Sequence, residues 1–168
     1  MLVVKDSAST DSASISNELK SKVKYGATDS IRYDLEAGKV YMFGKAHIEY
    51  EDINLIADYI ELNFTDHNLS AKGMPDSTGT MAGFPIFRQS NDEFKSESLK
   101  YNFDTKRGRI AEISTKDGDS YIHGSTVKKE SDNTTYIRNG YYTTCELPHP
   151  HYFIASNKIK VIPNNKVV

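Results

Sequence analysis

One unit recurs four times along this chain, and it constrains the fold more than any other feature. In each copy a small or acidic residue opens a stretch of alternating apolar and polar side chains, and a polar turn follows the first three copies. Alternation with a period of two places successive side chains on opposite faces of a β-strand. The copies open at Thr28, Ala57, Ser96 and Ala155. This pattern predicts repeated β units without a convincing helix.

The turns that follow the first three copies carry the residues that tight hairpins need. They span residues 36–39, 65–68 and 104–108, and they contain Gly, Asn and Asp, which tolerate positive φ. Short return strands are expected near 39–43, 69–72 and 109–113. Each of these copies therefore predicts a β-hairpin.

Further alternating segments extend the array. They lie near residues 46–50, 83–88, 120–123, 135–139 and 141–144, and the clearest loop between them is 74–80, with shorter loops at 115–120 and 129–134. About a dozen short strands describe an all-β sandwich or roll. Unequal spacing between the copies favours hairpins stacked along an axis, whose two end strands present edges that can pair with another β-protein.

Composition agrees with a sheet protein and disfavours some functions. The 168 residues include 11 Tyr and 7 Phe but no Trp, and aromatic residues favour strands. The net charge is −2, and the Lys and Arg residues are scattered along the sequence rather than clustered. We therefore expect no nucleic-acid partner.

The two ends of the sequence suggest its organisation. Residues 1–24 read as a flexible leader or a first edge strand, because residues 5–17 are rich in Ser, Asp and Ala. Residues 25–168 read as one β domain. The N-terminus is too short for a signal peptide, and the C-terminus resembles a strand, a turn and the opening of another strand. We expect either a cytosolic protein or, as the C-terminus favours, a part of a longer chain.

Three groups of residues resemble chemical sites; the third, the acidic pairs Glu49/Glu51 and Glu51/Asp52, lies in polar stretches and is expected to be solvated. His149 and His151 with Cys145 offer metal ligands, but a zinc site needs a fourth group, and the glutamate of a cupin-type motif is missing. Ser120 with His123 lacks the glycine-rich elbow of a serine nucleophile. We predict no catalytic residue, no metal site and no cofactor. Cys145 itself is either a small buried hydrophobe or half of a disulfide with a cysteine outside this sequence.

Four segments carry a family resemblance. Residues 141–152, read as YYTTCELPHPHY, with the strand 158–163 and the repeat at 57–60 and 70–73, resemble the soluble N-terminal part of the lipopolysaccharide-assembly, or organic-solvent-tolerance (OstA), proteins. The resemblance runs from about residue 25 to the C-terminus. It implies an OstA-type β-jelly roll, folded into two facing sheets of stacked antiparallel hairpins, ahead of a membrane β-barrel that this sequence lacks.

The resemblance also implies a location, partners and a role for one residue. The domain would lie at the periplasmic face of the bacterial outer membrane and would bind lipopolysaccharide, its own C-terminal barrel and, by edge-strand pairing, other jelly-roll domains. Cys145 matches a cysteine that bonds to the barrel portion; some relatives carry two cysteines in this part, so their full disulfide pattern does not carry over. A stand-alone periplasmic bridge protein shares the repeat, and a carbohydrate-binding jelly roll remains an alternative of another class.

Transport of a lipid through water requires its acyl chains to stay dry, because each exposed methylene costs about 0.8 kcal/mol. If two sheets splay along one edge, their inner apolar faces form a cleft for those chains. The apolar side chains of the four copies are the candidates for this inner, lipid-binding face: Ile31, Tyr33, Leu35, Ile60, Leu62, Phe64, Leu99, Tyr101, Phe103, Ile159 and Val161.

Overall fold

β-Strands make up nearly all the regular structure of this chain. The computed structural model describes residues 21–89, 92–117, 119–147, 150–162 and 166–167; most of the predicted leader lies outside them. Those residues form no helix able to cross a membrane. The strands are β1 (Lys24–Gly26), β2 (Ser30–Asp34), β3 (Lys39–Tyr50), β4 (Ile53–Asn63), β5 (Asn68–Lys72), β6 (Met74–Pro75), β7 (Met81–Ala82), β8 (Ile86–Gln89), β9 (Asp92–Lys95), β10 (Ser98–Asn102), β11 (Arg107–Asp117), β12 (Ser120–Lys129), β13 (Thr135–Thr143), β14 (Ile154–Ile162) and β15 (Lys166–Val167).

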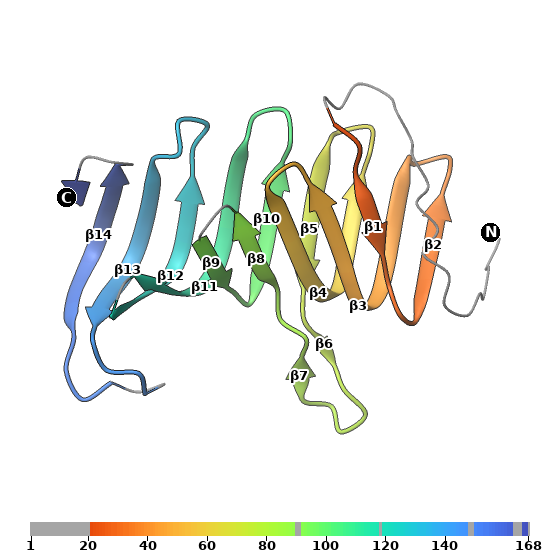
Figure 1. The fold of residues 1–168 in the computed structure, drawn as a ribbon. Helices are drawn as coiled ribbons and strands as arrows, with labels where there is room; N and C mark the ends of the chain where they lie inside the picture. Colours follow the sequence, from red (N-terminus) through yellow and green to blue (C-terminus); the bar gives the residue numbers. More distant parts are fainter. Residues whose placement is uncertain (1–20, 90–91, 118, 148–149, 163–165, 168) are drawn as a thin grey trace.

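The three predicted hairpins are confirmed. β2 pairs with β3, β4 with β5, and β10 with β11, each antiparallel and each joined by the expected polar turn. Neighbouring hairpins then pair with one another, so the order of strands runs from β1 and β2 at one end to β14 and β15 at the other (Figure 1). The array is the expected stack of antiparallel hairpins.

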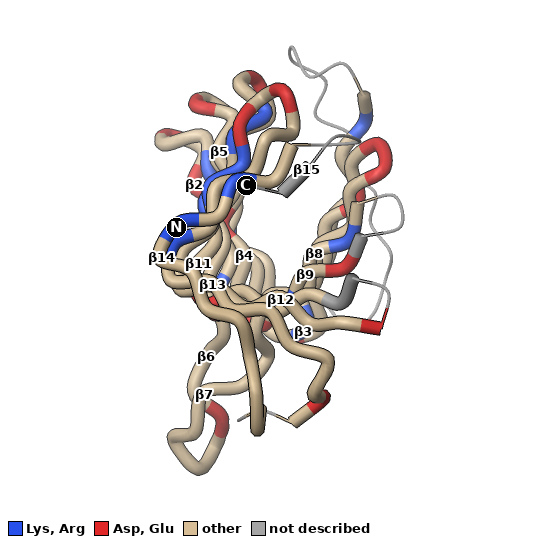
Figure 2. Tube along the Cα trace, turned by 90° about the vertical axis from the view of Figure 1, so that its left-hand side faces the viewer, with Lys and Arg blue, Asp and Glu red and all other residues tan. Residues whose placement is uncertain are grey.

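The long strands belong to two facing layers at once (Figure 2). The first layer contains β2, β5 and β10, and the second contains β1, β8 and β9. β3 pairs with β2 through residues 39–43 and with β1 through residues 47–49. In the same way, β4 pairs with β5 in the first layer and with β8 in the second. β11 pairs with β10 in the first layer and with β9 in the second. The layers are therefore joined along one side, which we call the bend.

Backbone geometry at the bend explains how one strand serves two layers. The β3–β4 register shifts between Phe43 and Ala46, where Gly44 and Lys45 both have positive φ. The registers of β11 and β13 skip Glu112 and Asn139, whose φ values are 48° and 49°. The extra residue in β3 is a β-bulge, which turns the strand sharply. At Glu112 and Asn139 the register continues without a shift, and the positive φ alone marks the bend.

The residues that open the sequence repeats stand at this bend. The N–H of Thr28 donates to the carbonyl of Gly44 over 2.8 Å, and that of Asp58 donates to the carbonyl of Gly83, also over 2.8 Å. In the third copy the Glu97 N–H donates to the Ala111 carbonyl over 3.0 Å. The repeat in the sequence therefore marks the points at which the chain passes along the bend.

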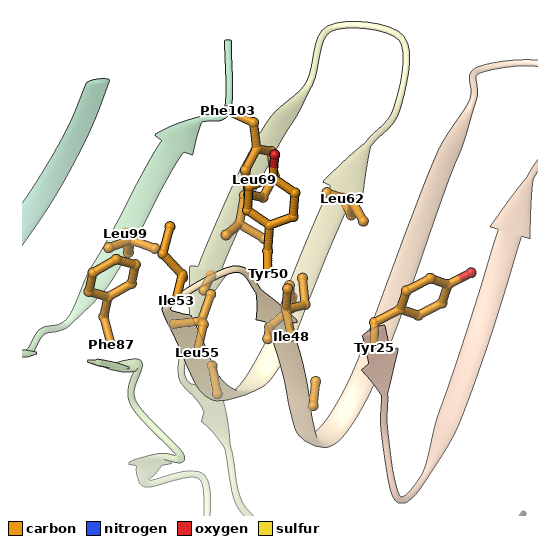
Figure 3. Packing of buried hydrophobic residues seen from close by; sticks show 14 of the residues in the cluster. Tyr25, Ile48, Tyr50, Ile53, Leu55, Leu62, Leu69, Phe87, Leu99 and Phe103 are labelled. Atoms are coloured by element: carbon orange, nitrogen blue, oxygen red, sulfur yellow. The ribbon is translucent and has the colours of Figure 1, made fainter. Parts of the chain in front are cut away.

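A core of aliphatic side chains fills the space between the layers in the region of β3, β4 and β5 (Figure 3). Ile48 and Leu55 come from the second layer, and Ile60, Leu62 and Leu69 come from the first. All five are at most 1% exposed. Full burial of each such side chain contributes roughly 1.5–3 kcal/mol, so this region holds the two layers together.

Several strand limits differ from the sequence expectation. Residues 39–43 and 46–50 were expected as separate strands, and so were 135–139 and 141–144, but each pair is one continuous strand. The expected loop at 115–120 is largely taken up by the ends of β11 and β12, and the loop at 74–80 closes a short β6–β7 hairpin. In β3 the alternation breaks at the bulge formed by Gly44 and Lys45, which in the sequence resembles the end of a strand.

Candidate functional site

The inner face of the first layer carries one continuous row of apolar side chains. Register places Leu99 opposite Ile110, Ile110 opposite Val127, Val127 opposite Ile137 and Ile137 opposite Ile159. Each of these residues shares one face of the sheet, because directly paired residues point the same way. The row therefore runs from the middle of the molecule to its C-terminal end.

The predicted lipid-binding residues fall into three groups by exposure. Ile60, Leu62, Leu99 and Phe103 are buried in the core, at 0%, 1%, 3% and 6% exposed. Five are half-buried at the borders of that core: Ile31, Phe64, Tyr101, Ile159 and Val161. The remaining two, Tyr33 and Leu35, are exposed at 42% and 90%.

The expectation that Leu35 lies on the inner face is wrong. β2 ends at Asp34, and its carboxylate accepts a hydrogen bond from the Ala37 N–H over 2.9 Å. This side-chain bond closes the turn one residue earlier than the alternation suggests. Tyr33 does stand opposite the buried Val40, but β2 is an edge strand and leaves it partly uncovered.

Aromatic side chains from the two layers meet across the space between them. The Tyr25 and Phe64 rings lie 6.3 Å apart, and the Phe87 and Tyr101 rings lie 6.4 Å apart. A third contact, between Tyr50 and Phe103, is edge-to-face with centroids at 5.0 Å. The space between the layers is thus filled with side chains here, so the inner face is not hollow along its whole length.

A cleft of about 450 Å³ opens on the side away from the bend, where the two layers are not joined. Tyr50 and Ile53 line it from the second layer, and Tyr101 and Phe103 line it from the first. Burial raises the pKa of both Tyr50 and Tyr101, so the two phenols stay neutral at physiological pH. The cleft therefore has an uncharged aromatic floor.

Polar side chains from the turns form the rim of this cleft. They include acidic, basic and amide groups: Glu51, Asp52, Gln89, Asp104, Lys106, Lys129, Ser131 and Asn133. Asp104 is held by His67, whose Nδ1 lies 2.8 Å from the carboxylate. The Lys129 ammonium donates to Gln89 Oε1 over 2.6 Å and so links β12 to the end of β8. An apolar floor under a charged rim suits an amphiphile.

The apolar row is less covered at the C-terminal end of the molecule. Ile137 is 7% exposed, whereas Ile159 and Val161 beyond it are only half-buried. Gly124 and Gly140 at the bend leave room for this row, since a β-carbon on them would lie 2.3 Å from Ile137 and 2.6 Å from Ile159. The row thus ends in side chains that a further apolar group can contact.

Cys145 lies just beyond β13 and is half-exposed. The Cys145 N–H donates to Thr143 Oγ1 over 3.0 Å, and the same hydroxyl donates to the Tyr152 carbonyl over 2.7 Å. The Cys145 sulfur is 3.8 Å from His151 Nδ1. This segment is held by hydrogen bonds to β13, and the disulfide inferred from the resemblance stays a prediction.

The residues considered for catalysis make other contacts. Ser120 Oγ is 2.5 Å from the Tyr142 hydroxyl, and the His123 ring stacks on Tyr141 with centroids at 4.5 Å. Within the part of the chain that is described, no group of three or more His, Cys, Asp or Glu side chains could hold a metal ion. His149 lies outside that part.

Sequence reasoning missed two sets of residues. The first comprises Ile110, Val127 and Ile137, which continue the apolar row and whose alternation in their own strands could have identified them. The second is a group of Lys and Arg side chains on the outer face of β10–β14, scattered in the sequence but gathered by the pairing of the strands. Strand register, which the sequence does not reveal, decides which distant residues become neighbours.

Comparison with known proteins gives one informative likeness. No protein family matches the sequence, and no curated protein matches it either. Among solved structures, the fold is similar to that of LptH from Pseudomonas aeruginosa, described as the LptA homologous periplasmic component of the conserved lipopolysaccharide transport device. The TM-score is 0.56 at 11% identity, over 80% of this chain and 93% of that chain. The comparison confirms the predicted fold, an all-β jelly roll of the kind seen in LptH.

Proposed function

We propose that this chain is a periplasmic component of lipopolysaccharide transport that shields acyl chains in the cleft between its two layers. The observation that carries the proposal is the aromatic cleft, open opposite the bend and bordered by charged turns. Its floor excludes water from an apolar chain, and its rim leaves a polar headgroup in solvent. The likeness of the fold to LptH supports the same role.

The core limits how the lipid enters. Leu62 and Ile60 are covered by the second layer, so acyl chains contact the cleft floor and the half-buried end of the apolar row rather than these residues. Each methylene that leaves water gains about 0.8 kcal/mol, which is enough to hold a chain without any covalent step. The protein therefore acts by binding alone.

Two members of such a transport system fit this role. The segment 141–152 and Cys145 favour the N-terminal part of an outer-membrane assembly protein, whereas the likeness to LptH favours a bridge protein. We propose the first, located at the periplasmic face of the outer membrane, with its own barrel and other jelly-roll domains as partners. Reading the coding sequence beyond Val168 for barrel strands distinguishes the two.

Photocrosslinking tests the cleft. A photoreactive phenylalanine analogue at Tyr101 should crosslink to lipopolysaccharide, whereas the same analogue at Lys72, exposed on the opposite face of the neighbouring strand, should not. Tyr101→Asp should abolish lipid binding, and circular dichroism checks that the variant folds. A deacylated saccharide should not compete. Equal crosslinking from both positions, or competition by the deacylated saccharide, would refute the cleft and favour a carbohydrate-binding domain.

A further inference from the structure

The outer face of the first layer carries a cluster of basic side chains across five neighbouring strands. Register places Lys100 opposite Arg109 and Arg109 opposite Lys128, and it also places Arg138 opposite Lys158. These residues alternate with those of the inner apolar row in the same strands, so they lie on the outer face of the wall that contains β11 and β14 in Figure 2. We call this surface the basic face, and its members are Lys100, Arg107, Arg109, Lys128, Arg138, Lys158 and Lys160.

Most of this positive charge is not neutralised within the protein. Glu130 pairs with Arg107 at 2.8 Å and with Lys128 at 2.6 Å, and the hydrogen bond from Lys128 lowers the pKa of Glu130. Among the described residues, no carboxylate forms an ion pair with Lys100, Arg109, Arg138 or Lys158. Like charges on paired strands destabilise a sheet. The face therefore attracts anions although the chain as a whole has a net charge of −2.

A shallow hollow of about 530 Å³ lies within the basic face. The side chains of Asn68, Asn102 and Tyr136 line it together with the basic residues. Asn102 Nδ2 donates to Asn68 Oδ1 over 3.0 Å, and the Tyr136 ring is 43% exposed, with the Lys160 ammonium 5.6 Å from its centroid. The hollow is large enough for a small ligand and combines charged, amide and aromatic groups.

We propose that this hollow is a binding site for a phosphorylated saccharide. Guanidinium groups bind phosphate oxygens in a two-pronged geometry. In the described part of the chain no carboxylate pairs with Arg109 or Arg138 and would compete. The amide nitrogen of Asn68 can donate to a sugar hydroxyl, with the Asn68 oxygen held by Asn102, and the exposed ring of Tyr136 gives the sugar an apolar surface to lie on. The ligand takes part in no bond-making step.

Two other polyanions fit less well. Sequence-independent binding of single-stranded nucleic acid uses several stacking rings along a groove. Two aromatic residues line this hollow among the described residues, but the ring of Tyr101 packs against Phe87 and Phe103, which leaves the ring of Tyr136 for stacking. A membrane surface is bound by apolar side chains that insert beside the charges, and those lining the hollow, Ile137 and Ile159, point to the inner face. Binding of nucleic acid and binding of a membrane surface are both measured in the experiment that follows.

The site is on the opposite side of the first layer from the cleft, so it is tested without acyl chains. The probe is a deacylated glucosamine disaccharide with a phosphate on each sugar, titrated by isothermal calorimetry and by amide NMR shifts. Inorganic phosphate, phosphatidylglycerol vesicles and a single-stranded oligonucleotide are titrated in parallel. The variant is Arg109→Gln with Arg138→Gln, and the matched control is Arg32→Gln with Arg88→Gln, which removes equal charge elsewhere.

The proposal predicts that the disaccharide binds more tightly than inorganic phosphate and shifts amides of β10–β14. The Arg109/Arg138 variant should weaken this binding at least about tenfold, and the control should leave it unchanged. Equal affinity for inorganic phosphate, tighter binding of the vesicles or the oligonucleotide, or equal loss in both variants would overturn the proposal. Tyr101 borders both the cleft and the hollow, so the two proposals are separated by the ligands: none of these probes carries an acyl chain, and their binding is independent of acyl-chain binding in the cleft.

Discussion

The carboxylate of Asp58 occupies the space that a β-carbon on Gly83 would need. A β-carbon placed on Gly83 would lie 1.8 Å from Asp58 Cγ, and Gly83 has a φ of +60°. The N–H of Asp58 donates to the Gly83 carbonyl over 2.8 Å, and Asp58 Oδ1 accepts from the Lys45 N–H over 3.3 Å. Asp58 therefore ties three segments together at the bend, and glycine is required beside it.

Gly83→Ala should destabilise the fold strongly, because it adds a steric clash to an unfavourable φ. We expect a loss of about 3 kcal/mol in the free energy of unfolding, measured by urea denaturation. Gly79→Ala is the matched control, since its φ is +84° but nothing lies within 4 Å of the added carbon. It should cost only about 1 kcal/mol. Equal losses at the two positions would contradict the role given to Asp58.

Leu62 and Leu35 were both expected on the inner face from the sequence, but they should respond very differently to truncation. Leu62→Ala should cost roughly 2–5 kcal/mol of unfolding free energy, because Leu62 is 1% exposed and its removal leaves a cavity. Leu35→Ala should change it by less than about 0.5 kcal/mol, because Leu35 is 90% exposed in a turn. Thermal or urea denaturation of both variants measures the difference. A large effect at Leu35 would mean that the turn is covered in solution.

His123 should make stability depend on pH. Desolvation beside Tyr141 lowers the pKa of His123 below its ordinary value of 6.5, so the unfolded chain binds the proton more readily. The contribution of His123 is then fully present above about pH 6.5 and is lost as pH falls from there towards the lower folded pKa. His123→Phe keeps a ring against Tyr141 and should flatten this part of the profile, measured by urea denaturation at several pH values. An unchanged slope in the variant would exclude His123 as the source.

The contact between Lys129 and Gln89 should control opening at the cleft. β8 and β9 are short, and β9 pairs with β11 through only Lys95 and Phe94. Lys129→Met removes the 2.6 Å hydrogen bond that links β12 to the end of β8. Amide hydrogen exchange in β8 and β9 should then become several-fold faster while β4 and β5 keep their protection. Uniformly faster exchange would indicate global destabilisation instead.

The hairpins could be predicted from the sequence because they depend on local signals. The alternation in Ile60, Leu62 and Phe64 and the Asn and Asp of the following turn specify β4 and β5 with no information from elsewhere in the chain. The same kind of alternation wrongly placed Leu35 in a strand, because the hydrogen bond to the Asp34 side chain ends β2 before it. Local patterns therefore predict where strands lie better than where they stop.

The second layer and the basic face could not be predicted in this way. Lys45 adopts a positive φ that its residue type does not signal, so the bend in β3 looks like a gap between two strands in the sequence. Glu112 also adopts a positive φ, but nothing in the alternation of its strand marks the bend there. Arg109, Lys128 and Arg138 are separated in sequence and meet only through the registers of β11, β12 and β13. Such features depend on pairing over long distances, which a single sequence encodes weakly.

The bend has a mechanical consequence for any guest molecule. Since β3, β4 and β11 each cross it and contribute to both layers, neither layer can detach without breaking strands of the other. The space between the layers can widen only if the strands flex where they cross the bend or if the short strands β8 and β9 lose their pairing. A bulky molecule would thus enter from the side, past β8 and β9. The stiffness of the backbone at Gly44 and its neighbours would set the largest cross-section that can enter.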